Sequence, residues 1–187
     1  MHAEGAGLRV GVFGGSFNPP HIGHALVAAW ALWTDLVDEV WLVPVFEHAF
    51  EKGQHLAPFD RRVSWCEQLA ADVDVRVRVS TVESGLPTPS YTLHTLQTLS
   101  SQHPDHSFRL IVGADVLEKI DEWHRWDDIR TAYSPIIVGR AGYPPVEGAP
   151  AFPQVSSTQL RARLDQGLSI EGFVTSRVAK ALRERSP

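Results

Sequence analysis

The chain has 187 residues, a formal net charge of −5, and 43% hydrophobic and 21% charged residues. This length and composition are typical of one globular domain with a sizeable core, so we expect a single domain over residues 1–187. The acidic balance argues against a nucleic-acid partner, because a large phosphate footprint needs a basic face.

Cysteine use and hydropathy indicate the compartment. Cys66 is the only cysteine, which excludes an internal disulfide and suits a reducing environment. It lies in a predicted amphipathic helix, so we interpret it as a buried structural thiol. The first residues lack a signal-peptide pattern, and the longest strongly apolar run, residues 25–33, is too short to span a bilayer. We therefore expect a cytoplasmic protein with no membrane partner.

A strand, a glycine turn and a buried helix are predicted first. Residues 8–15 (LRVGVFGG) begin as an apolar strand and stop at Gly14 and Gly15. Residues 22–36 are helical in pattern and apolar nearly all round, and residues 37–45 predict a second strand ending near Pro44. This order predicts parallel strands joined by a right-handed crossover.

The alternation of strands and helices continues along the chain. We expect helices at residues 60–71, 90–102, 157–165 and about 171–185, strands at 73–79, 107–115 and 134–140, and a loop at 141–153. The alternating valines from Val73 to Val79 indicate a strand with one solvated face, near a sheet edge. The pattern predicts a doubly wound, Rossmann-like α/β sheet with a C-terminal helical part, about residues 156–187, packed on it.

Several strands are predicted to end at the same edge of the sheet. Residues 14–15, 44–45, 113–115 and 139–140 all lie at carboxyl ends of predicted strands. In doubly wound sheets, ligands bind outside these ends. We therefore expect the four segments to meet at one crevice.

The segment GGSFNPPHIGH, residues 14–24, has the features of an anion site. Glycines let the backbone approach a ligand, and a helix N-terminus directs amides and positive dipole at it. His21 and His24 lie on one face of the first turn and can bond phosphate oxygens as imidazolium or as N–H donors. The alternatives are a metal-binding pair, for which no third ligand is apparent, or a helix-start residue. No G-x-G-x-x-G fingerprint is present, which argues against a dinucleotide cofactor of the usual kind.

Four segments carry a family resemblance. HIGH, residues 21–24, resembles the signature of the nucleotidyltransferase superfamily, and GGSFNPPHIGH is similar to the first motif of nicotinate or nicotinamide mononucleotide adenylyltransferases. SYTLHTL (90–96), GADVLEKIDEWHRW (113–126) and VSSTQLRARL (155–164) resemble further segments in family order. A class I aminoacyl-tRNA synthetase would need a longer chain and a K-M-S-K-S-like segment. The resemblance implies adenylyl transfer from ATP to a pyridine mononucleotide, giving deamido-NAD or NAD and pyrophosphate.

The resemblance also implies roles for individual residues. Catalytic roles, through charge stabilisation on the phosphates, fall to His21, His24, Lys52 and Arg161. ATP contacts fall to Gly14, Gly15, Ser16, Phe17, His21, His24, Gly113, Asp115, Ser157, Thr158 and Arg161. Mononucleotide contacts fall to Asn18, Lys52, Ser90, Tyr91, Thr92, Trp123 and Arg140. Mg²⁺ is expected with ATP, held by phosphates and water, and we assign it no protein ligand.

Residue chemistry supports some of these roles. Ser156 or Ser157 can cap the helix that follows, and Arg161 one turn further on can bind phosphate with two N–H groups. The alternative is an ordinary cap followed by a surface arginine. Asp115 suits a ribose hydroxyl or a substrate amide, and it could also cap a helix at residues 116–120.

The aromatic and basic candidates have alternatives of their own. By resemblance Trp123 stacks on the pyridine ring and Trp126 lies in the core, whereas the residues alone would place both in the core. Tyr91 and Thr92 would offer backbone groups to the pyridine substituent. Arg140 would reach a phosphate or the adenine, unless it is solvated.

One segment departs from the family pattern. Nicotinate-type bacterial enzymes usually follow the second strand with P-P-H-K, which is absent, and HAFEK at residues 48–52 looks closer to nicotinamide-type relatives. Lys52 is the candidate phosphate-contacting lysine, with His48 as its neighbour, or else a solvated loop lysine. Arg62 resembles the arginine that starts the following helix, and Arg61 is its rival. The choice between nicotinate and nicotinamide therefore stays open.

Two rival functions share the predicted fold. One is an adenylyl- or cytidylyltransferase for another phosphorylated acceptor, such as phosphopantetheine, against which Trp123 and SYTLHTL argue. The other is a nucleotide-binding sensor without turnover, against which the presence of His21, His24, Lys52 and Arg161 argues. A redox dehydrogenase is disfavoured by the missing glycine fingerprint.

Overall fold

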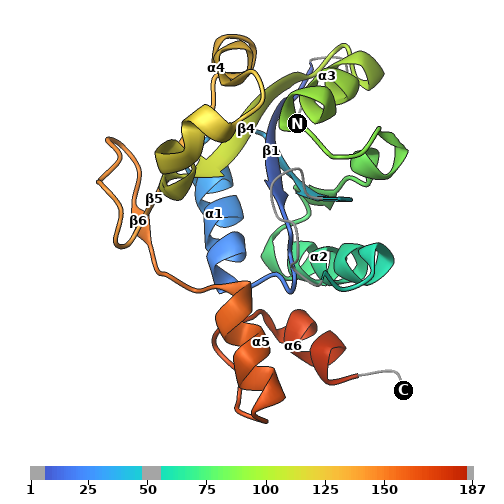
Figure 1. Cartoon of the computed structure of the whole chain (residues 1–187), viewed down its shortest axis with the longest axis vertical. Helices are drawn as coiled ribbons and strands as arrows, with labels where there is room; N and C mark the ends of the chain where they lie inside the picture. Colours follow the sequence, from blue (N-terminus) through green and yellow to red (C-terminus); the bar gives the residue numbers. More distant parts are fainter. Residues whose placement is uncertain (1–6, 48–55, 185–187) are drawn as a thin grey trace.

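A six-stranded parallel sheet forms the centre of the protein. The computed structural model describes residues 7–47 and 56–184. The strands are β1 (Arg9–Gly15), β2 (Glu39–Pro44), β3 (Val77–Val79), β4 (Ser107–Gly113), β5 (Ile136–Arg140) and β6 (Ala151–Phe152). Their order in the sheet is β3-β2-β1-β4-β5-β6, and every neighbouring pair is parallel. This arrangement confirms the predicted doubly wound α/β fold (Figure 1).

Helices connect the strands. They are α1 (Ile22–Trp33), α2 (Phe59–Val73), α3 (Thr92–Gln102), α4 (Trp126–Tyr133), α5 (Ser157–Asp165) and α6 (Ser176–Arg183), with two 3-10 helices, η1 (Val82–Gly85) and η2 (Ala114–Glu122). In Figure 1, α5 and α6 lie together at one end of the molecule, below α1 and α2.

Helices cover both faces of the sheet. On one face, α1, α2 and α6 bury Leu32, Leu69 and Val178 in a core that includes Leu42 of β2 and Ile111 of β4. On the other face, α3 and α4 bury a second core, whose members include Val10, Val12, Leu96, Leu110 and Ile129. Successive side chains of a strand point to opposite faces, so β4 supplies both cores with alternate residues.

The edge strand β3 is shorter than the valine pattern predicted. Helix α2 continues to Val73, and Val75 is 93% exposed in the turn that follows. Asp74 shapes this turn, because its carboxylate accepts from the Arg76 backbone N–H at 2.9 Å and its carbonyl accepts from the Val77 N–H at 3.0 Å. The strand therefore begins only at Val77. Its place at the sheet edge was predicted correctly.

Other boundaries also differ from the sequence prediction. The helix expected to begin near residue 171 begins at Ser176, because a turn with Gly172 at a φ of 82° precedes it. The predicted loop at residues 141–153 contains β6, which pairs with Gly139 and Arg140 at the other edge of the sheet. The helix expected to run to residue 36 ends at Trp33.

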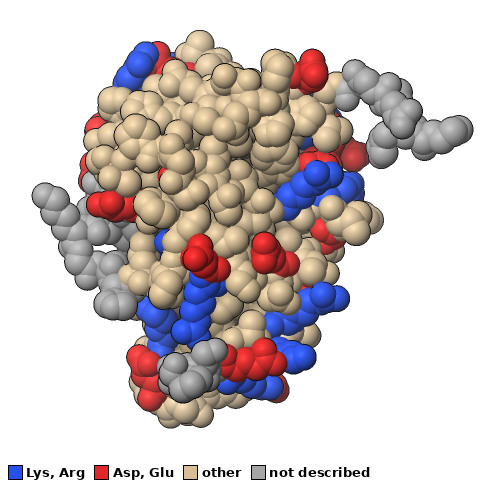
Figure 2. Space-filling view, turned by 90° about the vertical axis from the view of Figure 1, so that its right-hand side faces the viewer, with Lys and Arg blue, Asp and Glu red and all other residues tan. Residues whose placement is uncertain are grey.

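Charges of both signs are mixed on the surface. Figure 2 shows lysine and arginine mainly on the lower part of one face, interleaved with aspartate and glutamate, with a largely uncharged area above. Helix α3, which lies on this side of the molecule, has no charged residue. Among the residues that the structure describes, no helix is long and apolar enough to span a membrane.

Candidate active site

A cavity of about 430 Å³ opens at the carboxyl edge of the sheet. It lies between the ends of β1, β4 and β5 and the first turns of α1 and α5. Its lining includes the predicted site residues Gly14, Ser16, His21, His24, Gly113, Asp115, Trp123, Arg140, Ser157, Thr158 and Arg161. Sequence reasoning missed its apolar wall, which includes Val27, Ile111, Val138 and Phe152. These residues carry no chemical signal, because any apolar side chain can form such a wall.

The other predicted residues lie outside this lining. Gly15, Phe17, Asn18, Ser90, Tyr91 and Thr92 are not part of it, and Lys52 and His48 fall outside the described residues. The Phe17 side chain is 1% exposed and packs against the His24 ring, with centroids 4.8 Å apart. The Asn18 side chain accepts from the Ala57 N–H at 3.1 Å and so braces the segment before α2.

The two histidines form one unit. Their rings are stacked with centroids 3.7 Å apart, and the His21 backbone N–H donates to His24 Nδ1 at 3.0 Å. Because His24 Nδ1 accepts this bond, the neutral imidazole carries its proton on Nε2. His24 can therefore act as a hydrogen-bond donor through Nε2.

Burial keeps both histidines uncharged. It lowers the pKa of His21 to about 4, with a further contribution from the nearby Arg140 guanidinium. Burial also lowers the pKa of His24 well below its ordinary value, helped by His21 and Arg140. Of the two forms considered from the sequence, burial thus supports the neutral N–H donor and not the imidazolium. A polyphosphate in the cavity would favour protonation, since an opposite charge raises a histidine pKa.

Gly23, between the histidines, lets this pair form. A Cβ on Gly23 would lie 3.0 Å from His21 Nδ1, so a larger residue would push the ring away from the helix. The helix offers fewer amides than the sequence suggested. The Ile22 N–H donates to the Phe173 carbonyl at 2.8 Å, and the His24 N–H donates to the His21 carbonyl at 2.9 Å. The side chains of the pair are therefore the main donors of this turn.

The start of α5 binds the loop that precedes α1. Ser156 is the cap, because its hydroxyl accepts from the Gln159 N–H at 3.2 Å. Ser157 Oγ donates to the Pro19 carbonyl at 2.8 Å, and Arg161 Nη1 donates to the Asn18 carbonyl at 2.6 Å. The two segments are about 140 residues apart in the chain, and these bonds bring their phosphate-binding candidates to one cavity.

An ion pair spans the β4 and β5 side of the cavity. Arg140 Nη1 lies 2.6 Å from Asp115 Oδ2, and both side chains are about one third exposed. The Asp115 carboxylate lies over Gly113, where a Cβ would be 2.3 Å from Oδ1. Asp115 does not cap η2, whose N-cap is Gly113. Neither residue is therefore a solvated or purely capping group.

An aromatic group borders the Trp123 end of the cavity. The Trp123 and Trp126 rings meet edge to face at 5.5 Å, and both pack partly buried against the second core. The Tyr91 ring lies 4.6 Å from the His124 ring. His124, next to Trp123 in the chain, was not predicted, although its position in the W-H-R-W string was a signal. The start of α3 thus lies beside the Trp123 end.

The two arginines at the start of α2 have different surroundings. Arg62 is 1% exposed and donates to three carbonyls, those of Ser16, Val45 and Ala57. Arg61 instead lies over the Trp65 ring, 5.2 Å from its centroid. Within the described part of the chain, no group of three histidine, cysteine, aspartate or glutamate residues could hold a metal ion.

Comparisons with known proteins agree on the family. A family model described as cytidylyltransferase-like matches residues 12–163. A relative from Anaeromyxobacter sp. (strain K), named probable nicotinate-nucleotide adenylyltransferase, is 46% identical over 182 residues and covers 96% of each chain. A protein of the same name from Bacteroides thetaiotaomicron is 34% identical over 97% of this chain and 94% of its own.

Solved structures show the same fold. A putative nicotinate-nucleotide adenylyltransferase from Vibrio parahaemolyticus superposes with a TM-score of 0.75 at 20% identity, covering 94% of this chain and 99% of its own. A Plasmodium falciparum nicotinic acid mononucleotide adenylyltransferase, complexed with NaAD, gives 0.75 at 18% identity over 94% and 95%. The chain belongs to the cytidylyltransferase-like family and, within it, to the nicotinate-nucleotide adenylyltransferases.

Proposed function

We propose that the protein transfers the adenylyl group of ATP to nicotinate mononucleotide, giving deamido-NAD and pyrophosphate in NAD biosynthesis. The observation that carries this proposal is the convergence of His21, His24 and Arg161 on one cavity at the carboxyl edge of the sheet. Relatives with up to 46% identity carry the nicotinate name, which favours nicotinate over nicotinamide mononucleotide as the acceptor.

The phosphate end needs donors more than it needs a nucleophile. An oxygen of the mononucleotide 5′-phosphate attacks the α-phosphorus of ATP, and the bond to the bridging oxygen breaks to release pyrophosphate. Positioning and charge stabilisation supply most of the catalysis of such transfers. We assign His24 Nε2–H and His21 to the triphosphate, with Arg161 and Thr158 from α5 on the same phosphates. No covalent intermediate with the protein is required.

The part of the cavity lined by Trp123 suits the mononucleotide. Trp123 offers a partly buried indole on which a pyridine ring can stack. The backbone at the start of α3, residues 91–92, lies beside it, since the Tyr91 ring contacts the His124 ring, and amide groups there can bond a carboxylate. Asp115, which the sequence assigned to ATP, is held by Arg140 and is placed to accept from a ribose hydroxyl of that nucleotide.

Magnesium is proposed as part of the ATP complex. When bound, Mg²⁺ supplies positive charge to the triphosphate and keeps water among its ligands. The side chains of the described cavity that could bind a metal ion are neutral histidines and a carboxylate already paired with Arg140. This set suits binding of Mg²⁺ through the phosphates of ATP more than through several protein ligands.

A substrate panel tests the function. The purified protein is given ATP and Mg²⁺ with nicotinate mononucleotide, nicotinamide mononucleotide or phosphopantetheine, and pyrophosphate release is followed. We expect release with nicotinate mononucleotide at a kcat/KM at least about tenfold above that for the amide. Greater release with another acceptor would reject the proposed substrate, and tight ATP binding without release from any acceptor would identify a sensor.

A further inference from the structure

A buried carboxylate lies beside the site but outside its cavity lining. Glu83, in η1, is 7% exposed. Its Oε2 accepts from the Phe46 backbone N–H at 3.0 Å, and its Oε1 accepts from the Thr95 hydroxyl at 2.9 Å. A buried carboxylate is costly unless such bonds compensate for lost hydration. This one joins the segment after β2 to the first turn of α3.

Arg62 holds the same peptide group from its other side. Arg62 Nη1 donates to the Val45 carbonyl at 2.8 Å, while the Phe46 N–H of that peptide donates to Glu83. A buried cation and a buried anion therefore bind the oxygen and the nitrogen of one peptide, which fixes its plane. Burial lowers the pKa of Arg62, and Glu83 is close enough to oppose this shift.

This peptide is connected to the Trp123 end of the cavity. The backbone carbonyl of the next residue, Glu47, accepts from the Ser90 backbone N–H at 3.0 Å. Ser90 precedes Tyr91, the N-cap of α3, whose ring lies 4.6 Å from the His124 ring. Glu83 thus restrains the start of α3 twice, directly through Thr95 and indirectly through the Phe46–Glu47 segment.

We propose that Glu83 is a positioning residue for the mononucleotide end of the site, an inference that rests on the proposed function for the identity of the ligand there. Glu83 fixes the peptide between Val45 and Phe46 and the first turn of α3, and these set the backbone that meets the pyridine substituent. Its hydrogen bonds with Phe46 and Thr95 do not reach the triphosphate end. Arg62 differs, because it also donates to the Ser16 carbonyl in the glycine turn at 3.0 Å.

The test separates the two substrates. In Glu83→Gln, the amide oxygen can accept from the Phe46 N–H, but the amide N–H groups can only donate to the Thr95 hydroxyl, so the direction of that bond is reversed and both bonds lose the charge of the carboxylate. Calorimetry measures the Kd of nicotinate mononucleotide and of ATP separately. We expect the Kd and KM of the mononucleotide to rise about tenfold, because a small displacement of the backbone that contacts a ligand has effects of this size. The Kd and KM of ATP should change less than about twofold.

Glu39→Gln is the matched control. Glu39 is also 7% exposed and accepts from Trp41 Nε1 at 2.8 Å and pairs with Arg78 at 2.8 Å, but it lies at the amino end of β2. The same substitution there should lower thermal stability and leave both Kd values unchanged. If Glu83→Gln only lowers stability, as the control does, or weakens both substrates equally, the positioning role is wrong.

Thr95 gives a second test in case Glu83→Gln does not fold. Thr95→Val keeps the shape and removes the hydroxyl donor, and Thr95→Ser keeps the donor. We expect the valine variant to weaken mononucleotide binding selectively and the serine variant to restore it, and equal binding by both variants would overturn the proposal. The Kd values are measured without turnover, so this test does not depend on the reaction. If the variants lose mononucleotide binding selectively but the wild-type protein releases no pyrophosphate, the positioning role is retained and the proposed reaction is rejected.

Discussion

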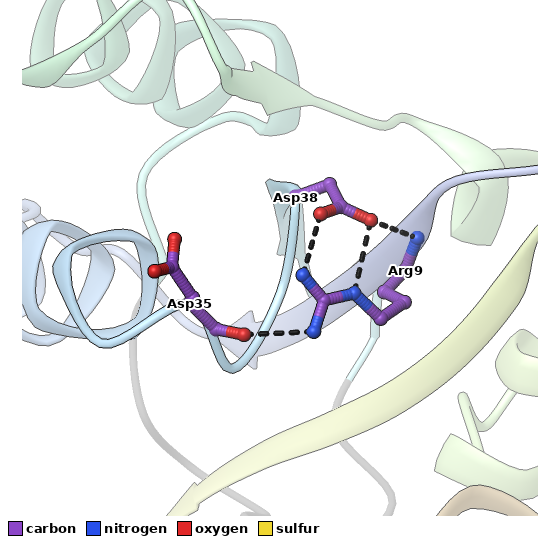
Figure 3. Close-up of polar contacts among 3 residues, drawn as sticks. All are labelled: Arg9, Asp35 and Asp38. Carbon is purple, nitrogen blue, oxygen red and sulfur yellow. Dashed lines mark hydrogen bonds and ion pairs between the residues drawn. The ribbon is translucent and has the colours of Figure 1, made fainter. Parts of the chain in front are cut away.

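The polar groups at the two ends of strand β1 differ in exposure and charge. At the amino end, Arg9 donates to both oxygens of Asp38, through Nη2 at 2.6 Å and Nε at 3.1 Å, and to the Asp35 carbonyl at 2.8 Å (Figure 3). These charges are largely exposed, and Asp38 raises the pKa of Arg9. At the carboxyl end, His21 and His24 are desolvated and uncharged.

This difference in burial indicates which end of β1 contributes to catalysis. The amino-end charges face solvent and neutralise one another, so they are screened by water and contribute little. The carboxyl-end donors are desolvated beside a cavity, where an incoming polyphosphate would meet a low dielectric and strong hydrogen bonds. Substitutions at the carboxyl end should therefore change turnover, and conservative ones at the amino end should not.

The largest effect is expected for His24→Ala. Loss of one well-placed donor to the developing charge costs roughly 3 kcal/mol of barrier, so kcat should fall about a hundredfold or more. Initial rates of pyrophosphate release measure this, with circular dichroism to confirm the fold. The control is His103→Ala. His103 is another partly buried histidine, which follows α3 and packs against the Trp41 ring, and its loss should leave kcat unchanged. Equal losses in both variants would contradict the assignment.

The lowered pKa of His21 predicts that the stability of the fold depends on pH. The unfolded chain takes up a proton near pH 6.5, whereas burial lowers the pKa of His21 in the folded protein to about 4. The free energy of unfolding should therefore fall as the pH drops from about 6.5 to 4, by up to about 3 kcal/mol, and stay constant above this window.

Urea denaturation at several pH values checks this prediction. His21→Asn removes one of the two buried rings and should reduce the wild-type slope between pH 6.5 and 4, with the remaining slope contributed by His24. The same slope in both proteins would show that His21 titrates normally.

Arg161→Lys should have an intermediate effect. Arg161 donates to the Asn18 carbonyl at 2.6 Å and to Thr158 Oγ1 at 3.3 Å, and lysine cannot reproduce this planar set of donors. We expect kcat/KM for ATP to fall about tenfold to a hundredfold. Arg163→Lys, two residues further along α5, is the control. Unchanged kinetics in Arg161→Lys would remove Arg161 from the phosphate site.

The smallest effect is expected for Arg9→Lys. Lysine keeps the charge and loses the two-pronged contact with Asp38. Both KM values and kcat should match the wild type, with only a slight drop in the midpoint of thermal unfolding. A large loss of turnover would show that the amino end is coupled to the site.

The sequence allowed much of this arrangement to be predicted. Periodicity and glycine turns predicted the parallel sheet and the convergence of its carboxyl edges, because these depend on local patterns. The same patterns were wrong near Val73 and Val75, where helix α2 and the Asp74 turn override the alternation. Strand β6 is two residues long and has no local pattern of its own.

Long-range polar partners could not be predicted. The Asp115–Arg140 ion pair joins residues 25 positions apart, and the bond from Phe46 to Glu83 joins residues 37 positions apart. Such pairs depend on how separate elements pack. The resemblance indicated which side chains belong to the site, but the uncharged state of His21 and His24 depends on burial that only the fold provides.

The most direct measurement follows the α-phosphoryl group. ATP labelled at the α-phosphorus is mixed with nicotinate mononucleotide, Mg²⁺ and the protein, and the products are separated over time. We expect the label to appear in deamido-NAD, with unlabelled pyrophosphate released in equal amount. Label that remains in ATP while both ligands bind, or that becomes attached to the protein, would contradict direct adenylyl transfer at this site.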